Sequence, residues 1–228
     1  MADAAVIFDV DGVLLELTRA EEDAFFAPFE QRYGLKNLSR DWNSYAVRND
    51  ENIIAEILEI HGLPAQERTE VVADYLSILK KRLSDGTIES AIIPGAHELI
   101  ERLQGMAKLG IATANLLTAA ELRLSHAGLW RHVSDHAAGA EGGGHKREIL
   151  ARAIASTGLP KPQIIYVGDN LNDVDAGLSN GVHFIGFSTS QPRLGELALA
   201  GTFYTSSNHT KTCDLICHLL DIDKRPKL

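Results

Sequence analysis

Cysteine is scarce in this chain of 228 residues. Its two cysteines, Cys213 and Cys217, stand four positions apart in an apolar helical pattern. Two cysteines cannot build the disulfide framework of a small secreted domain, so we interpret both as small core residues. A reducing, cytoplasmic compartment is the simplest interpretation of this usage.

Long hydrophobic runs and net positive charge are missing as well. No uninterrupted apolar stretch approaches the roughly 18 residues that a membrane-spanning helix requires. The chain has 22 Lys and Arg against 31 Asp and Glu, which gives a net charge of −9 at pH 7. Proteins that bind nucleic acid or an anionic membrane normally present a basic face, so the sequence argues against both kinds of partner.

The rest of the composition is that of a globular protein, with 45% hydrophobic and 23% charged residues. There are no internal repeats and no low-complexity segments. At about 150 residues per domain, the length fits one large domain or one domain with a smaller unit. An anionic substrate would have to be attracted locally, against an unfavourable overall charge.

Short apolar segments alternate with helical patterns through much of the chain. The run at residues 4–10 (AAVIFDV) is too short for a typical helix and is typical of a buried strand. Further strands are expected at residues 109–113, 163–167, 182–187 and 202–205, with a weaker one near 133–137. This alternation predicts an α/β fold, in which a Rossmann-like parallel sheet is covered by helices on both faces.

Residues 16–91 interrupt the alternation. They contain no convincing strand, and their apolar positions recur at helical spacing between glycine-containing breaks. We therefore predict a small antiparallel helical bundle inserted after the first strand, with a return to the sheet near residues 94–95. The expected organisation is a catalytic core of residues 1–15 and 92–228 and a helical cap of residues 16–91.

Two acidic residues follow the first expected strand. In residues 8–14 (FDVDGVL), Asp9 and Asp11 are two positions apart in an extended segment, so their side chains point to the same side. They stand at the C-terminal end of an apolar strand, where open α/β sheets place their binding sites. The alternative is a polar turn, in which aspartate is chosen for turn formation.

A second acidic segment follows a late strand. In residues 166–173 (YVGDNLND), Asp169 and Asp173 are four positions apart, and a helix beginning near Asn172 would project Asp173 back toward the strand end. Helix capping by Asn172 or Asp173 is the alternative. Carboxylates at two strand ends of one sheet would repel one another without a cation, and oxygen ligands with water suit Mg²⁺.

These motifs resemble those of the haloacid dehalogenase (HAD) superfamily of aspartate-nucleophile phosphotransferases. The four family motifs occur in order: DVDGVL, then Thr113 at a strand end, then Lys146 at a helix start, then GDNLND. The helical insertion resembles the family's first-type cap, as in the phosphoglycolate-phosphatase-like subfamily. The chain departs from many relatives at Ala114, which separates Thr113 from Asn115.

The resemblance implies catalytic and phosphate-binding roles. It makes Asp9 the nucleophile that forms an aspartyl-phosphate, because covalent catalysis divides one difficult displacement into two easier ones. It makes Asp11 the general acid that protonates the leaving group and then the base that activates water. Thr113, Asn115 and Lys146 would bind the oxygens of the phosphate group.

The resemblance also implies a Mg²⁺ site. Its ligands would be the carboxylate of Asp9, the backbone carbonyl of Asp11 and the carboxylate of Asp169. Asp173 would bind the ion directly or through water. The ion would offset the repulsion between the nucleophile and the phosphate.

Two basic residues, Arg147 and Arg48, each have two possible roles. Arg147 adjoins Lys146 and is the alternative phosphate-binding cation, although a compact ammonium fits a gap between phosphate and carboxylate better. In the cap, Arg48 is the candidate for binding a second anionic group of the substrate. The alternative for Arg48 is a solvated arginine beside a helix N-cap.

The leading functional hypothesis is a Mg²⁺-dependent phosphatase acting on a small phosphomonoester, such as a phosphoglycolate-like compound or a sugar phosphate. A cap that closes over the site suits small substrates. The alternatives are a phosphomutase similar to β-phosphoglucomutase, which must protect the aspartyl-phosphate from water, and a non-catalytic phosphate-binding regulatory protein. The expected partner is a small phosphorylated metabolite, with the chain acting as a monomer or homodimer.

Overall fold

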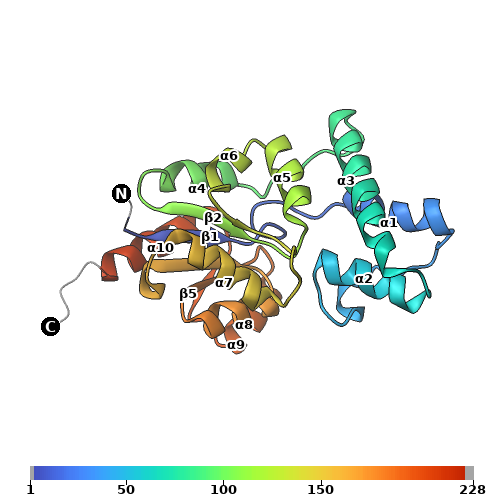
Figure 1. The fold of residues 1–228 in the computed structure, drawn as a ribbon. Coiled ribbons are helices and arrows are strands. Elements are labelled where there is room, and N and C mark those ends of the chain that lie inside the picture. Colours follow the sequence, from blue (N-terminus) through green and yellow to red (C-terminus); the bar gives the residue numbers. More distant parts are fainter. Residues whose placement is uncertain (1–2, 224–228) are drawn as a thin grey trace.

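A six-stranded parallel sheet forms the centre of the computed structural model, which describes residues 3–223 (Figure 1). Its strands are β1 (Ala5–Phe8), β2 (Lys108–Ala112), β3 (His136–Ala138), β4 (Ile164–Gly168), β5 (His183–Phe187) and β6 (Tyr204–Ser206). Their order is β3-β2-β1-β4-β5-β6, and every neighbouring pair is parallel. Each expected strand overlaps one of these six, which confirms the predicted parallel α/β sheet.

Helices cover both faces of the sheet. One face packs against α4 (Ala96–Leu103), α5 (Leu117–His126), α6 (Trp130–Val133) and α10 (His209–Asp223). The other face packs against α7 (Lys146–Thr157), α8 (Leu171–Asn180) and α9 (Gln191–Leu199), and a short 3₁₀ turn η3 (Lys161–Gln163) precedes β4. Strand β1 shows why its sequence is apolar throughout: Val6 and Phe8 enter one core cluster, while Ala5 and Ile7 enter the other.

Three helices lie beside the sheet in Figure 1 and form the predicted helical bundle. They are α1 (Arg19–Tyr33), α2 (Asp50–Ile60) and α3 (Arg68–Ser84), with the 3₁₀ turns η1 (Trp42–Ser44) and η2 (Ala65–Glu67) between them. Their buried side chains form a separate hydrophobic cluster around Phe29, Ile54 and Leu79. Residues 16–91 remain the proposed extent of this cap.

The cap is docked on the core through the start of α2. The Asp50 N–H donates to the Ala114 carbonyl over 2.9 Å, and the Leu116 N–H donates to the Asp50 carboxylate over 2.9 Å. Beside this pair, the Asn49 side-chain amide donates to the Gly144 carbonyl over 2.6 Å. These bonds join the cap to the loop after β2 and to the loop before α7, so the end of the sheet that carries the two acidic motifs is covered.

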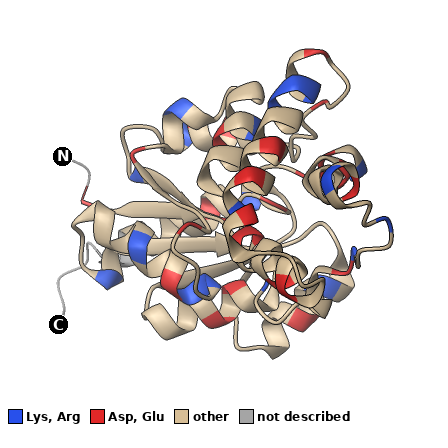
Figure 2. Cartoon of the chain, turned by 45° about the vertical axis from the view of Figure 1, so that its right-hand side comes forward, with Lys and Arg blue, Asp and Glu red and all other residues tan. Residues whose placement is uncertain are grey.

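Charged segments of both signs are interspersed over the helices and loops in the view of Figure 2. None of the helices in residues 3–223 combines the length with the apolar character that a membrane crossing demands. Cys213 is buried in a core cluster and Cys217 packs against the same cluster, both as free thiols. This placement agrees with their interpretation as small core residues.

Candidate active site

Asp9 comes directly after β1, at the covered end of the sheet. Its backbone N–H donates to the Val167 carbonyl over 2.8 Å, which continues the pairing of β1 with β4 by one residue. Its Oδ1 atom accepts hydrogen bonds from the Val10 N–H and from the Lys146 ammonium, both over 2.7 Å. The carboxylate is therefore fixed by its own backbone turn and by a helix from elsewhere in the chain.

Asp173 lies in the first turn of α8 and is completely buried. Its Oδ2 atom accepts from the N–H groups of Asp169 and Asn170, at 3.2 and 3.0 Å, as part of a capping box. Its Oδ1 atom accepts from the Tyr166 hydroxyl over 2.6 Å and lies 3.1 Å from Lys146 Nζ. Asp173 thus caps α8 and contacts Lys146 at the same time, because the cap bonds hold the carboxylate that lies beside the ammonium.

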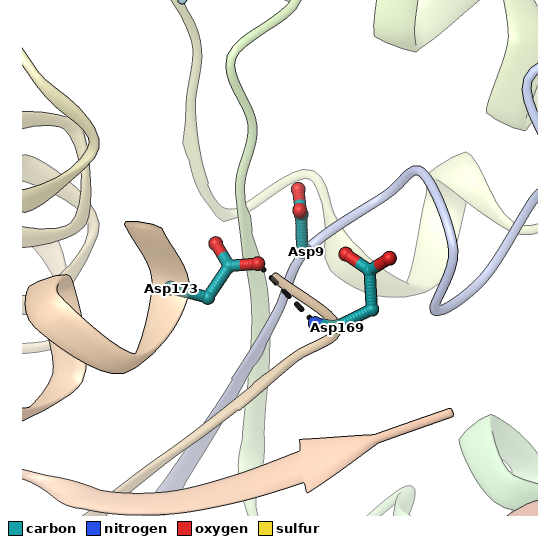
Figure 3. A group of neighbouring side chains, drawn as sticks. All are labelled: Asp9, Asp169 and Asp173. Atoms are coloured by element: carbon teal, nitrogen blue, oxygen red, sulfur yellow. Dashed lines mark hydrogen bonds between the residues drawn. The ribbon is translucent and has the colours of Figure 1, made fainter. Parts of the chain in front are cut away.

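The carboxylates of Asp9, Asp169 and Asp173 converge at the ends of β1 and β4 (Figure 3). One oxygen from each lies within 4.8 Å of the others. Burial raises the pKa of the Asp9 carboxyl against the opposing pull of the Lys146 ammonium, and the neighbouring carboxylates add to the rise. Burial, with the charge of Asp173, also raises the pKa of Asp169 to about 7.

This donor set fits a hard divalent cation. The pKa values rise because three acidic groups share a buried space with a single ammonium, and a cation among them would lower these values. All the donors are oxygens, which Mg²⁺ prefers. Gly12 leaves room for Asp169: its φ of 77° suits glycine, and a Cβ atom there would lie 2.3 Å from Asp169 Oδ2.

The structure brings Lys146 into the site and leaves Arg147 outside. Lys146 is buried at the start of α7, and the charges of Asp173 and Asp9 raise its pKa although burial opposes this, so the ammonium stays protonated. Arg147 is about half exposed and pairs with Glu148 over 2.8 Å. Of the two basic residues, only Lys146 contacts the acidic cluster of Asp9, Asp169 and Asp173.

Thr113 and Asn115 follow β2 and line the same cavity as Asp9 and Lys146. Thr113 is buried, and its hydroxyl oxygen accepts the Asn115 N–H over 3.1 Å. The Asn115 side-chain oxygen accepts a hydrogen bond from Arg123 over 2.9 Å. The insertion of Ala114 between the two polar residues therefore leaves both of them facing the site.

Arg123 is the residue that sequence reasoning missed. It belongs to α5, is 2% exposed, and its Nη2 atom lies 2.7 Å from Asp11 Oδ1. Its Nε atom donates to Glu21 of α1 over 2.6 Å. A signal was present, because Arg123 stands three and four positions after Ala120 and Ala119, which places it on the same helical face as these apolar residues.

Arg48 lines the cavity from the cap side. Its guanidinium lies near enough to Asp169 to oppose the rise of that carboxyl's pKa, and its Nη1 atom donates to the Asn43 side-chain oxygen over 3.4 Å. Asp50 lines the same wall, and burial raises its pKa to about 7. The cap thus contributes one cation, Arg48, and one buried acid, Asp50, to the wall of the cavity.

The cavity between cap and core has a volume of about 250 Å³. Its floor holds Asp9, Asp169 and Lys146, and its cap wall includes the aromatic residues Phe25, Trp42 and Tyr75. A small polar molecule fits a space of this size. Seven of the sequence-predicted site residues line it directly, namely Asp9, Asp11, Arg48, Thr113, Asn115, Lys146 and Asp169.

Comparison with protein families matches residues 6–187 to the haloacid dehalogenase-like hydrolases. Similar solved structures include CbbY from Rhodobacter sphaeroides in complex with phosphate, with 22% identity and a TM-score of 0.73 over 92% of this chain and 95% of that one. A CbbY variant in complex with xylulose-1,5-bisphosphate has 19% identity and a TM-score of 0.72 over the same shares.

A putative β-phosphoglucomutase from Bacteroides vulgatus has 17% identity and a TM-score of 0.69, over 98% of this chain and 91% of that one. A search of curated proteins finds no match. At identities this low the similar structures show a shared fold, and the activity has to be argued from the site itself.

Proposed function

The chain belongs to the haloacid dehalogenase-like hydrolase family, and we propose that it is a Mg²⁺-dependent phosphatase that hydrolyses a small phosphomonoester through an aspartyl-phosphate. One observation carries the proposal: the buried ammonium of Lys146 lies 2.7 Å from Asp9, beside two further carboxylates, at the floor of a small cavity. A nucleophilic carboxylate, a fixed cation and oxygen ligands for a metal are the three requirements of this chemistry.

In the first step, a carboxylate oxygen of Asp9 forms a bond to phosphorus while the bond from phosphorus to the leaving oxygen breaks. Asp11 supplies the proton that the leaving oxygen takes up. In the second step, Asp11 takes a proton from water as the water oxygen attacks the phosphorus. Inorganic phosphate then leaves and the Asp9 carboxylate is regenerated.

The phosphate group needs donors that face its oxygens during both steps. The Thr113 hydroxyl, the Asn115 amide and the Lys146 ammonium all line the cavity near Asp9. Lys146 contributes a fixed positive charge where negative charge develops, and its two carboxylate partners prevent it from turning away.

Asp9 and Asp169, with the backbone carbonyl of Asp11, are the residues that would hold Mg²⁺. The ion would offset the charge of the phosphate oxygens and so permit an anionic nucleophile to approach them. We propose a water-mediated role for Asp173, because its carboxylate oxygens already accept bonds from Tyr166 and from two backbone N–H groups. Its main task would be to hold Lys146 in place.

The cavity favours a small substrate with a hydroxylated leaving group. Besides Arg48, the charged residues that the cap contributes to the wall are acidic, among them Glu16 and Glu22. Carboxylates are poor neighbours for a substrate carboxylate, whereas sugar hydroxyls can donate to them. Among the substrates considered, a sugar phosphate therefore fits better than a phosphoglycolate-like compound, with Arg48 contacting an anionic group.

The test is a screen of phosphorylated metabolites and p-nitrophenyl phosphate with the purified protein, with Mg²⁺ or with a chelator. We expect Mg²⁺-dependent release of phosphate that Asp9→Asn abolishes, while Asp175→Asn, which alters an exposed acid of α8, preserves it. Full activity of Asp9→Asn would refute the nucleophile. Fast isomerisation of a sugar phosphate with little phosphate release would support a phosphomutase instead, and binding without turnover would support a regulatory protein.

A further inference from the structure

Arg123 connects three parts of the molecule through one buried guanidinium. Its Nη2 atom lies 2.7 Å from Oδ1 of Asp11, in the segment that follows β1. Its Nε atom donates to Oε1 of Glu21, on cap helix α1, over 2.6 Å. Its Nη1 atom donates to Oδ1 of Asn115, after β2, over 2.9 Å. The side chain is 2% exposed, so these partners replace the water that a free guanidinium would bind.

The charges in this group depend on one another. Burial lowers the pKa of Arg123, but the charges of Asp11 and Glu21 outweigh this and keep the guanidinium protonated. A buried charge that loses its partner is strongly destabilising, so Arg123 stays with both carboxylates. Its planar fork fixes the directions of its donors, which a lysine ammonium in the same place would not do.

The local sequence determines where Glu21 stands. Thr18 and Glu21 form a capping box at the start of α1, in which Oε2 of Glu21 accepts from the Thr18 N–H and hydroxyl over 2.7 and 2.8 Å. This leaves Oε1 for Arg123. Glu21, in the first turn of α1, therefore binds the Nε atom of the same guanidinium whose Nη2 atom binds Asp11.

We infer that Arg123 is a positioning residue that orients Asp11 for proton transfer, and that Glu21 of the cap fixes Arg123 in this arrangement. The inference rests on the proposed function. With Oδ1 of Asp11 bonded to Arg123, Oδ2 is the oxygen that gives its proton to the leaving oxygen and takes one back from water. The bond from Arg123 to Oδ1 of Asn115 likewise fixes the orientation of this side-chain amide, so that its NH₂ group is directed toward other acceptors.

Proton transfer to the leaving group can be measured separately from the rest of catalysis. The p-nitrophenolate leaving group is a stable anion and needs little protonation, whereas the alkoxide of an aliphatic phosphate such as glycerol 2-phosphate needs it fully. In the first step, a residue that serves proton transfer affects aliphatic substrates selectively, whereas the later attack of water on the aspartyl-phosphate is common to both substrates. A residue that only supports the fold affects both kinds of substrate alike.

The experiment compares kcat/KM, which reports the step in which the leaving group departs, for the two substrates in Arg123→Lys, with Asp11→Asn as the reference for lost proton transfer. We expect Arg123→Lys to lose about 100-fold in kcat/KM on the aliphatic phosphate and less than about 5-fold on p-nitrophenyl phosphate. Arg102→Lys, which alters an exposed arginine on α4, is the matched control and should change neither value.

Glu21→Gln keeps the test open if Arg123→Lys does not fold. Glutamine can still cap α1, and its neutral oxygen holds Arg123 more weakly, so the same selective loss should appear at smaller size. Equal losses on both substrates, or no loss on either, in a folded variant would overturn the inference. An inactive wild-type protein would instead overturn the proposed phosphatase function, so the two failures are distinct.

Discussion

Lys146 and Asp9 form a buried ion pair: the Lys146 Nζ atom lies 2.7 Å from Asp9 Oδ1, and both residues are buried. The two residues come from the first turn of α7 and from the end of β1. A contact between groups so far apart in sequence forms only when the helix docks on the sheet. The fold itself therefore places the cation beside the proposed nucleophile.

This contact predicts that substitutions at the adjacent residues Lys146 and Arg147 have very different effects on activity and stability. We expect Lys146→Gln to reduce kcat by about 100-fold or more, because a fixed charge at the transferring group is lost. It should also lower the free energy of unfolding by about 3 kcal/mol, since buried carboxylates lose their partner. Arg147→Gln should leave both values near wild type, because its guanidinium is half exposed. Steady-state kinetics and urea unfolding measure the two effects, and reversed outcomes would make Arg147 the functional cation.

A second prediction concerns the space that Gly12 leaves. In Gly12→Ala, the new Cβ atom would stand 2.3 Å from Asp169 Oδ2, so the carboxylate must move. We expect the Mg²⁺ concentration for half-maximal activity to rise at least about 10-fold, the lower range for losing the orientation of a metal ligand. Gly195→Ala is the control, because no atom lies near its Cβ position in α9. It should keep full activity, and equal metal dependence in both variants would contradict the prediction.

The sheet and the acidic motifs were predictable from local patterns. Strand β1 is apolar at every position because both of its faces are buried, and such a run can be recognised without any partner. The convergence of Asp9 and Asp169 followed from two strands ending at the same edge of a parallel sheet. The dual role of Asp173 could not be chosen in advance, because capping and site residues share one sequence pattern.

Contacts that depend on how the cap docks were beyond sequence reasoning. Arg123 and Glu21 are separated by 102 positions, and nothing in either local sequence names the other. Asp50 stands in the first turn of α2, where acidic residues are common in helices, yet it accepts a hydrogen bond from the Leu116 backbone in the core. Such pairs are decided by tertiary packing, for which a single sequence carries no periodic signal.

A third prediction tests the cap wall. We expect Arg48→Ala to raise KM for the physiological substrate by about 10-fold or more, because hydrogen bonds to charged groups contribute about 1.5–3 kcal/mol. Lys80→Ala, which removes an exposed cation from cap helix α3, should leave KM unchanged. Initial rates over a range of substrate concentrations give the KM of each variant. An unaltered KM and unaltered substrate preference in Arg48→Ala would show that this arginine is a solvated surface residue.

The last prediction concerns Asp50, whose pKa burial raises to about 7. Between about pH 4 and pH 7 the folded protein keeps this carboxyl protonated while the unfolded chain releases the proton. The folded state then binds more protons, so stability falls as pH rises, by up to about 1.4 kcal/mol per pH unit for one group. Asp50→Asn retains an oxygen for the Leu116 N–H but cannot ionise, so it should lack this part of the pH dependence.

Urea unfolding of wild type and Asp50→Asn at pH 5, 6, 7 and 8.5 measures the difference. The advantage of Asp50→Asn over wild type should grow through pH 7 and level off above it, because the wild-type carboxyl is then ionised in both states. Asp169, whose pKa is also raised to about 7, titrates in both proteins, so its contribution cancels in the comparison. Parallel stability curves would mean that Asp50 ionises in the folded protein as it does in water, and that the start of α2 is open to solvent.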